Sequence, residues 1–434
     1  MPYSFELQRL AEEVSLWADL RHEQGADVSG VVEGVCKALK QARKELRKEE
    51  ADTTKEPDDL EGIRSLRPEG PRRLWSRLKD QRLKDRMRGA WLGRAAGCTL
   101  GAPVENWSIS DMEALAARTR SGFPPEDYWG DHPWPEHVRY GVDNNGAYLK
   151  GRIRYVPVDD DVAYTLLGLL ILEEYGTDFT TAAVAAAWMK YLPIAYTAER
   201  VTLENLRDGE PAETAGVKRN PYMEWIGAAI RADAWGYAAP GWPEKAAELA
   251  WRDGRLSHRR NGIYGEMFFA ASIAAAFAVD DPVEAIRIGL TEIPAESRLA
   301  EDVRWALETG PQLTDWRDGR AAVDKRFGGM NSVHTNNNAC LTVFGLMLGV
   351  GDFTRTIGWT VTMGLDNDCT AATAGSLFGA AKGARKIPEH WWKPFRNRTR
   401  TYMIGQEWFA NSGVVERFLT AAVRVWGGDN GETE

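Results

Sequence analysis

The stretch CTAATAGSLFGAAKGA (369–384) decides the fold of this chain. Its small residues fall on one face of a helix: Ala372, Gly375, Ser376, Gly379, Ala380 and Gly383. Such a face lets a second helix approach closely, although each glycine costs about 1 kcal/mol of helix propensity. The stretch therefore predicts a buried helix that packs tightly against a neighbour.

Three further segments are apolar on nearly every side. They are VAYTLLGLLILEEYG (162–176), GEMFFAASIAAAFAV (265–279) and ACLTVFGLMLGV (339–350). A helix that is apolar all round must be buried by other helices. Strand-like alternation is rare, and RIRYVPV (152–158) is the best short candidate. We therefore expect an all-α fold over residues 84–434, interrupted around residues 124–157 by an irregular surface insertion rich in aromatics, proline and glycine.

Residues 1–83 have a different composition, with many charges and few glycines. Helical stripes of apolar residues run over residues 5–20 and 28–42, and the charged run RKELRKEEADTTKEPDD (43–59) follows them. We interpret residues 1–83 as a helical extension with a charged linker. The helical pair either packs on the main domain, the interpretation we favour, or serves as a docking or dimerisation appendage.

Composition excludes several classes of protein. The 434 residues are 44% hydrophobic and 27% charged, which is enough apolar surface to form a core. The net charge of −9 argues against a nucleic-acid binder. The four cysteines form no CxxC pair, and no apolar run approaches the roughly 18–20 residues of a membrane span. With no signal peptide at the N-terminus, we expect a cytoplasmic protein without nucleic-acid or membrane partners.

Three consecutive carboxylates, Asp159, Asp160 and Asp161, stand directly before the apolar segment 162–176. A carboxylate often caps a helix, where the macrodipole stabilises an anion by about 0.3–1 kcal/mol. Capping accounts for one aspartate of the three. A divalent cation accounts for all of them, because hard cations bind carboxylate oxygens.

Asp366 and Asp368 stand in the same position before the segment 369–384, within GLDNDCT (364–370). If the two helix ends converge, five carboxylates meet at one place. Each unpaired buried charge would cost several kcal/mol, and two divalent cations would nearly neutralise the group. We therefore expect the two clusters to share one metal site.

Ordered motifs over residues 84–395 resemble the ADP-ribosylglycohydrolase family. RGAWLGRAAGCTLGAPVE (88–105) is similar to the family's opening helix and its loop glutamate. Residues 159–162 resemble its Thr-Asp-Asp-Thr metal motif, and residues 366–369 resemble its Asp-Thr-Asp-Thr motif. Ser257 and His258 look like its middle Ser/Thr-His segment, and IPEHW (387–391) looks like its tail.

The resemblance implies an orthogonal all-α helical bundle that holds one or two Mg²⁺ or Mn²⁺ ions and cleaves a glycosidic bond at ribose C1 in ADP-ribosyl groups. By motif match, the implied metal ligands are Asp159, Asp160, Asp161, Asp366 and Asp368. Glu105 matches the loop glutamate, as an acid/base or substrate-positioning residue. Without the resemblance, Glu105 would be interpreted as an ordinary loop carboxylate.

Departures from the family pattern point to a divergent branch. Asp159 and Val162 stand where the family has threonine, and Cys369 stands where a threonine usually binds metal. Cys98 replaces a common aspartate. Sulfur is a soft donor that suits magnesium poorly. The alternatives are therefore a hydrolase of a non-nucleotide glycoside or nucleoside on the same fold, and a non-catalytic sugar- or nucleotide-binding protein.

The chemistry of glycoside cleavage assigns the catalytic candidates. The reaction needs a proton donor for the leaving atom and a base that activates water. Divalent ions grip vicinal hydroxyls and lower the pKa of a bound water. Glu105, Asp160 and Asp161 are the expected catalytic residues, and the small-molecule substrate is a glycoside or an ADP-ribosyl group. The sequence leaves the oligomeric state open.

Residues around two other apolar segments are the expected substrate contacts: His258, Asn261, Tyr264, Gly265 and Asn336. A buried structural histidine and helix-capping asparagines are the alternatives. Four tryptophans are candidates for stacking on a sugar: Trp107, Trp129, Trp134 and Trp225. HPWPEH (132–137) offers two histidines and a glutamate for a metal, although its prolines favour a rigid surface loop.

Overall fold

The computed structural model describes residues 3–46, 54–78, 81–131, 138–144 and 146–427. Contacts divide the chain into two compact units, Met1–Lys55 and Glu56–Glu434. This division lies before the boundary that the composition predicts after residue 83. The reason is local: Arg67 and Arg72 both pair with the buried Glu292, at 2.6 and 3.0 Å, so this part of the linker packs on the second unit.

The first unit consists of α1 (Tyr3–Glu23) and α2 (Ser29–Leu46), and the two helices agree with the two predicted stripes. Asp27 Oδ1 accepts hydrogen bonds from the backbone N and the hydroxyl of Ser29, which starts α2. The apolar side chains of both helices are largely exposed, among them Leu16, Trp17 and Val31. The two helices therefore bury little of each other's apolar surface within this unit.

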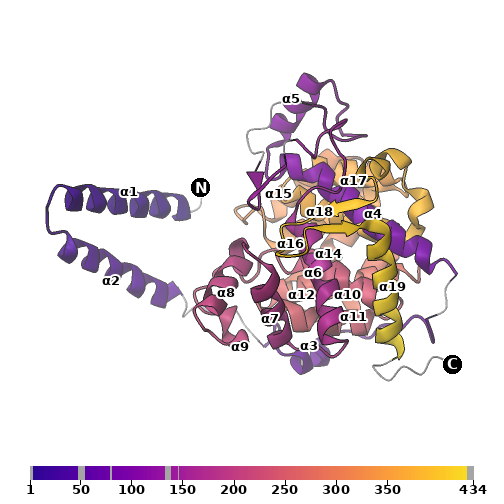
Figure 1. The fold of residues 1–434 in the computed structure, drawn as a ribbon, viewed down its shortest axis with the longest axis horizontal. Helices are drawn as coiled ribbons and strands as arrows, with labels where there is room; N and C mark the ends of the chain where they lie inside the picture. The colour runs from indigo at the N-terminus through magenta and orange to yellow at the C-terminus, as the bar shows by residue number, and fades with distance from the viewer. Residues whose placement is uncertain (1–2, 47–53, 79–80, 132–137, 145, 428–434) are drawn as a thin grey trace. The chain divides into compact units, whose positions relative to one another are not determined.

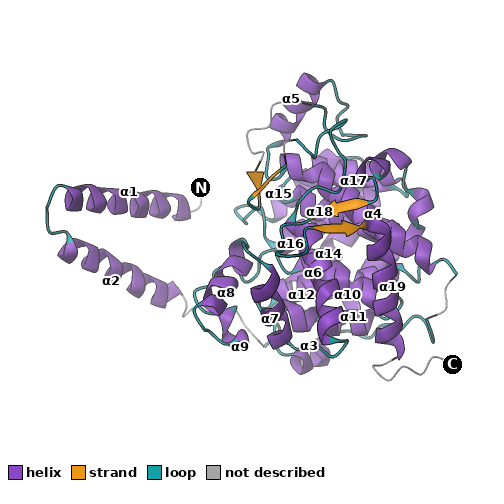
Figure 2. Cartoon of the chain, viewed as in Figure 1, coloured by secondary structure: helices purple, strands orange, loops and turns teal. Residues whose placement is uncertain are grey.

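The second unit confirms the all-α prediction, because strands in its described residues form only two short antiparallel ribbons (Figure 2). Its helices are α3 (Leu60–Leu66), α4 (Leu83–Gly101), α5 (Ile109–Thr119), α6 (Asp160–Tyr175), α7 (Thr181–Tyr191), α8 (Thr197–Arg207), α9 (Ala212–Ala215), α10 (Ala232–Ala238), α11 (Pro243–Gly254), α12 (Asn261–Ala276), α13 (Pro282–Gly289), α14 (Arg298–Thr309), α15 (Trp316–Arg326), α16 (Thr335–Gly349), α17 (Phe353–Thr362), α18 (Asn367–Lys382) and α19 (Asn411–Gly427).

Short 3-10 helices and strands complete the unit. The 3-10 helices are η1 (Ala102–Val104), η2 (Ala229–Arg231), η3 (Leu290–Glu292), η4 (Gly310–Gln312), η5 (Ala384–Lys386), η6 (Glu389–Trp391) and η7 (Lys393–Phe395). The ribbons pair β1 (Val138–Arg139) with β2 (Val142–Asp143), and β3 (Arg398–Arg400) with β4 (Trp408–Ala410). None of the described helices has the length and apolar character needed to cross a bilayer.

Helices α4 and α18, both labelled in Figure 1, pack along one another in the core of the second unit. Glycines at every fourth position of α4 face the backbone of α18. A Cβ atom at Gly89 would lie 2.5 Å from the carbonyl oxygen of Gly379, and one at Gly101 would lie 2.5 Å from the backbone N of Asp368. The predicted small-residue face of 369–384 therefore meets a second such face, and the contact fixes the start of α18 against the end of α4.

The irregular insertion around residues 124–157 is present, but it is more than a surface feature. Tyr128 and Trp129 are buried, because the aromatic side chains that mark this stretch pack into the core. The predicted strand RIRYVPV is wrong: only Val156 forms a bridge, to Thr399, since the ladder does not continue on either side. The insertion instead forms the β1–β2 hairpin.

Candidate functional site

The first turns of α6 and α18 meet, which brings the two predicted acidic clusters together. Asp159 is the N-cap of α6, and its Oδ1 accepts a hydrogen bond from the backbone N of Asp161 at 3.1 Å. Asp366 occupies the N-cap position of α18 without capping it, and Asp368 lies in the first turn. Cys369 Sγ donates to Asp161 Oδ2 at 3.1 Å and joins the two helix ends directly.

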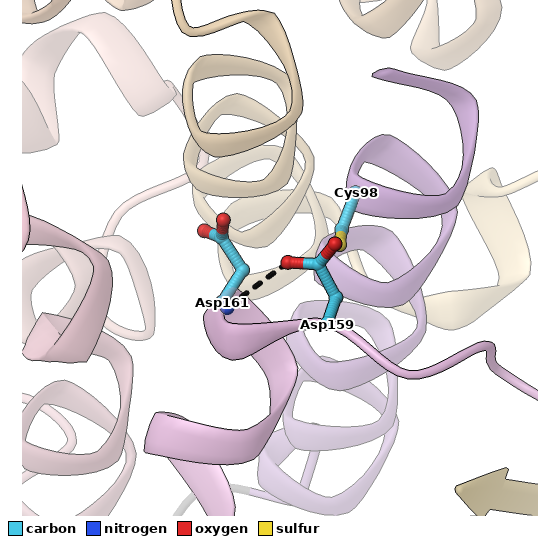
Figure 3. Close-up of side chains that lie close together, drawn as sticks. All are labelled: Cys98, Asp159 and Asp161. Atoms are coloured by element: carbon cyan, nitrogen blue, oxygen red, sulfur yellow. Dashed lines mark hydrogen bonds between the residues drawn. The ribbon is translucent and has the colours of Figure 1, made fainter. Parts of the chain in front are cut away.

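Helix α4 supplies the buried groups behind this junction. Arg94 is fully buried and donates to Asp161 Oδ1 at 3.1 Å and to Asp233 Oδ2 at 2.7 Å. Cys98 lies one turn further along α4, with its sulfur beside the Asp159 carboxylate (Figure 3). The close approach of α4 and α18 thus places an arginine and a thiol against the acidic cluster.

The β1–β2 hairpin adds a cation to the site. Arg139 Nη2 lies 2.9 Å from Glu105 Oε2, 3.1 Å from Asp159 Oδ2 and 3.3 Å from Asp368 Oδ2. The next residue, Tyr140, has a φ of +53° and Gly141 a φ of +72°, the left-handed pair of a type I′ hairpin turn. Tyr140 Oη donates to Asp160 Oδ1 at 2.8 Å, which offsets the cost of a bulky residue in that conformation.

A cavity of about 440 Å³ opens onto these groups. Its described lining residues are Glu105, Asn106, Val138, Arg139, Tyr140, Asp160, Tyr164, Tyr196, Thr197, Glu199, Trp225, Ile226, Gly227, Ile230, Val333, Asp366, Asp368 and Cys369. The lining of the cavity therefore combines carboxylates with aromatic rings. That combination suits a sugar or nucleoside, whose hydroxyls need acceptors and whose faces stack on rings.

Burial and mutual repulsion make the carboxylates hard to ionise without a cation. Burial raises the pKa of Asp159, Asp161 and Asp366 well above the ordinary carboxyl value. The neighbouring Asp368 charge, followed by burial, raises the pKa of Glu105 to about 8. Burial raises the pKa of Glu199, which also lines the cavity, to about 7. The cluster therefore retains protons or attracts cations at neutral pH.

Three groups of side chains bring one potential ligand atom each to within 4.8 Å of one another. They are Glu105, Asp366 and Asp368; Asp161, Asp368 and Cys369; and Cys98, Asp159 and Asp161. Only the first group consists entirely of oxygen donors, which Mg²⁺ and Mn²⁺ prefer. Asp366 Oδ1 in that group is buried and accepts no hydrogen bond. The donor set of the first group therefore fits a hard divalent ion.

Not all of the predicted metal and catalytic residues reach the cavity. Glu105, Asp160, Asp366 and Asp368 line it. Asp159 and Asp161 belong to the same cluster but lie behind the cavity wall, since they are buried against Arg139, Cys98, Arg94 and Cys369. Direct contact with a substrate is thus open to four of these six residues.

The predicted substrate-contact residues do not line the cavity. His258 is buried behind it, with Nδ1 2.8 Å from Ser257 Oγ and 4.0 Å from Glu199 Oε1. A Cβ atom at Gly265 would collide with Thr335, so this glycine allows α12 and α16 to approach closely. Both residues have packing partners that account for their burial.

The three remaining predicted contacts hold helices together at a distance from the cavity lining. Asn261 Nδ2 donates to Glu56 Oε1 at 3.0 Å, and Tyr264 Oη donates to the backbone oxygen of Pro57 at 2.5 Å. Asn336 Nδ2 donates to Asp302 Oδ2 at 2.7 Å. Their donor groups are used within the protein, because the linker and α14 fold back onto α12 and α16, whereas the buried Asn336 Oδ1 accepts no hydrogen bond from the described residues.

Sequence reasoning missed Arg139, Tyr140, Tyr196 and Glu199 as cavity residues, but it included Trp225. Arg139 and Tyr140 stand in an irregular segment where no periodicity or motif marks them. The predicted stacking residue Trp129 is fully buried, and Trp107 lies beside a separate cavity. Trp134 and HPWPEH (132–137) lie outside the described residues.

Comparisons with known proteins agree with the fold and the order of the motifs. The family model described as ADP-ribosylglycohydrolase matches residues 79–424. A protein of Archaeoglobus fulgidus described as "Uncharacterized protein" is 26% identical over 327 residues, which cover 73% of this chain and 93% of that protein. A solved structure titled "ADP-ribosylglycohydrolase-related protein complex" superposes with a TM-score of 0.55 at 19% identity, over 80% of this chain and 100% of that one.

Proposed function

This chain belongs to the ADP-ribosylglycohydrolase family, and we propose that it is a metal-dependent hydrolase that cleaves a ribosyl-type, furanoside glycosidic bond. The supporting observation is the convergence of Glu105, Asp160, Asp366 and Asp368 on one cavity. These residues come from three distant parts of the sequence. Repulsion between their like charges destabilises the fold, so their convergence indicates a functional site rather than a structural one.

Glu105 is the proposed proton-transfer residue. Its side chain is one-third exposed, its Oε2 pairs with Arg139, and the charge of Asp368 raises its pKa to about 8. A carboxyl group in this environment holds a proton near neutral pH and can pass it to the leaving atom of a glycoside. Asp160, whose Oδ1 accepts the hydroxyl hydrogen of Tyr140, is the proposed acceptor for a sugar hydroxyl or an attacking water.

Mg²⁺ or Mn²⁺ is the proposed cofactor, held by Asp366 and Asp368 beside the proton-transfer residue Glu105. When bound, such an ion would grip vicinal sugar hydroxyls and acidify a water. The chain itself orients these groups: the start of α18 presents Asp366 and Asp368, and Glu105 follows the 3-10 helix η1. Asp159 and Asp161, which the motif match also gives as ligands, contribute negative charge from behind this group.

A nucleoside or other uncharged glycoside is the second candidate substrate. Of the described residues that line the cavity, Arg139 alone is cationic, and it is already paired with carboxylates. A pyrophosphate group would therefore meet an acidic wall. The aromatic side chains of Tyr140, Tyr196 and Trp225 offer stacking surfaces to a base or a sugar without phosphates.

Release of free reducing sugar in the presence of Mn²⁺ tests the function. We expect turnover of an ADP-ribosyl conjugate or of a nucleoside, and the ratio of the two rates decides between the candidates. Glu105→Gln should reduce turnover by at least about 100-fold while retaining the fold. Glu113→Gln, an exposed change on α5, is the matched control and should have no effect.

Binding without turnover separates an enzyme from a binding protein. Asp368→Asn should abolish calorimetrically measured Mn²⁺ binding, because the residue belongs to the only described all-oxygen donor group. Saturable binding of ADP-ribose or a nucleoside, with no sugar released from any substrate, would favour a non-catalytic role. Unchanged Mn²⁺ binding in the variant would contradict the proposed metal site.

A further inference from the structure

Arg139 occupies a position among the carboxylates that a cation would otherwise fill. Its Nη2 lies within 3.3 Å of oxygens of Glu105, Asp159 and Asp368, which come from three separate motifs. Its Nη1 donates to the backbone oxygen of Ala102 at 2.7 Å. One positive group thus bridges all parts of the acidic cluster.

The hairpin holds this guanidinium firmly in place. The Arg139 side chain is only 13% exposed. The adjacent Tyr140 ring stacks on Tyr402 with centroids 4.9 Å apart and planes 10° apart, and its hydroxyl donates to Asp160. The contacts of Tyr140 therefore hold the backbone next to Arg139 in place. The guanidinium itself is held by hydrogen bonds to Ala102, Glu105 and Asp368 and by the ion pair with Asp159.

The remaining donor groups are poor second sites for a hard ion. The two other groups each contain a thiol, Cys98 or Cys369, and both depend on Asp161. Both carboxylate oxygens of Asp161 are already engaged, Oδ1 by Arg94 and Oδ2 by Cys369. Sulfur donors and an occupied carboxylate disfavour Mg²⁺ or Mn²⁺ there. The oxygen group of Glu105, Asp366 and Asp368 retains the buried, unpartnered Asp366 Oδ1.

We propose that Arg139 is a resident cation that replaces one divalent ion, so that the site binds a single ion. This inference rests on the metal-dependent function proposed above. Arg139 forms an ion pair with Asp159 and donates hydrogen bonds to one oxygen each of Glu105 and Asp368. Its charge repels a second ion nearby. The single ion is bound by Asp366 and by the other oxygen of Asp368, beside Glu105.

Counting bound manganese tests the proposal on the full chain. The metal-stripped protein is saturated with MnCl₂, freed of unbound metal and analysed by elemental analysis and electron paramagnetic resonance. We expect one Mn²⁺ per chain with the spectrum of an isolated ion. Arg139→Met should bind two ions with the spectrum of a coupled pair, and Arg139→Lys should stay at one. Arg152→Met, an exposed arginine of the same insertion that pairs with Asp131, is the control and should also stay at one.

The outcomes separate this inference from the function on which it rests. Two ions in the unaltered chain would overturn the role of Arg139 and leave metal dependence intact. One ion in a folded Arg139→Met variant would overturn it as well. Absence of Mn²⁺ from the unaltered chain would overturn both proposals. Two ions in the unaltered chain would refute the role of Arg139 even if Arg139→Met fails to fold.

The α1–α2 pair carries an independent inference, because its apolar side chains are exposed. Leu16, Trp17 and Val31 are 63%, 53% and 66% exposed. A shallow groove on α1 is lined by apolar and charged residues: Leu16, Trp17, Leu20, Arg9, Glu12 and Glu13. On α2, apolar residues alternate at spacings of three and four, as in a coiled-coil seam: Val32, Val35, Leu39, Ala42 and Leu46. Exposed apolar side chains at helical spacing on both helices make this pair a candidate interaction surface.

We infer that the occupant of this surface is the α1–α2 pair of a second copy of the chain. Helix α1 is acidic, with Glu6, Glu12, Glu13, Asp19 and Glu23 against Arg9 and Arg21. Helix α2 is basic, with Lys37, Lys40, Arg43 and Lys44 against Glu33 and Glu45. Two copies related by a twofold axis place α1 of each on α2 of the other, where the charges are complementary.

Light scattering of the full chain after gel filtration tests this interface. We expect a dimer, and the double substitution Leu10→Glu with Trp17→Glu should convert it to a monomer. Ile404→Glu introduces the same charge at an exposed apolar residue of the second unit and should leave the dimer unchanged. A monomeric unaltered chain, or a dimer that survives the double substitution, would refute the inference.

Discussion

Cys369 donates its thiol hydrogen to Asp161 Oδ2 over 3.1 Å, and this contact joins the first turns of α18 and α6. By the motif resemblance of residues 366–369, a threonine would stand at the position of Cys369. The thiol preserves the hydrogen bond of a hydroxyl while removing a hard oxygen from the metal ligands. The convergence of the two acidic motifs is thus retained, although one donor has changed.

Removing this contact should destabilise the fold. In the metal-free protein, Cys369→Ala leaves a buried carboxylate oxygen without its donor, and the free energy of unfolding should fall by about 1–3 kcal/mol. Cys369→Ser keeps a donor and should stay close to the unaltered value. Urea denaturation followed by circular dichroism measures both. Equal losses in the two variants would show that packing of the sulfur, rather than the hydrogen bond, is responsible.

Breaking the buried pair behind the site should have a larger effect. Arg94 is fully buried and bound to Asp161 and Asp233, so Arg94→Met leaves two buried carboxylates without their cation and should cost about 3–5 kcal/mol. Arg417→Met removes the partly exposed pair with Glu173 and should cost less than about 1 kcal/mol. Thermal and urea unfolding compare the two. A loss of similar size in both variants would contradict the importance of burial.

The α4–α18 contact should be intolerant of a single methyl group. A Cβ atom at Gly97 would collide with the backbone of Ala371, so Gly97→Ala should lower the free energy of unfolding by about 1–3 kcal/mol. Gly413→Ala in α19 is the control: its Cβ atom would meet only Ala410, at 3.7 Å, and the change should be neutral or stabilising. A stable Gly97→Ala variant would mean that the helices can separate without cost.

The acid stability of the protein should depend on His258. Burial, together with the charges of Arg231 and Arg259, holds the pKa of His258 well below its usual value. The unfolded chain binds a proton below about pH 6.5 that the folded chain cannot, so stability from this group is present above that pH and is lost as pH falls. Between pH 7.5 and 5.5 the loss is about 1.4 kcal/mol.

A matched variant isolates the contribution of the histidine, because carboxylates with raised pKa values act in the opposite direction. The free energies of unfolding of the unaltered chain and His258→Gln are compared at both pH values. The unaltered chain should lose about 1.4 kcal/mol more than the variant on acidification. Parallel pH profiles would show that His258 is protonated in the folded state.

Truncation should distinguish the two possible starts of the main unit. A chain of residues 56–434 keeps Arg67 and Arg72 against the buried Glu292 and should melt as the second unit of the full chain does. A chain of residues 84–434 leaves Glu292 buried without either arginine and should melt at a lower temperature. Differential scanning calorimetry provides the comparison. Identical melting of both fragments would support the boundary that composition predicts.

The elements of the site that local sequence determines were predictable. Apolar segments and the carboxylates before them give the helices α6 and α18 and their acidic first turns, because burial and capping act over a few residues. Arg139 was not predictable: it reaches Glu105, Asp159 and Asp368 only through the path of an irregular hairpin. The predicted contacts Asn261 and Asn336 have partners, Glu56 and Asp302, that only the packing of distant segments brings near.

The glycine contact between α4 and α18 has a consequence for how this protein can change. The contact holds the end of α4 at the start of α18, so the backbones that carry Glu105 and Asp368 are held near one another by packing away from the cavity. Tyr196 and Trp225 line the same cavity from segments outside that contact. Substitutions at these two aromatic residues can therefore change substrate preference while the backbones that carry the reactive groups stay in place.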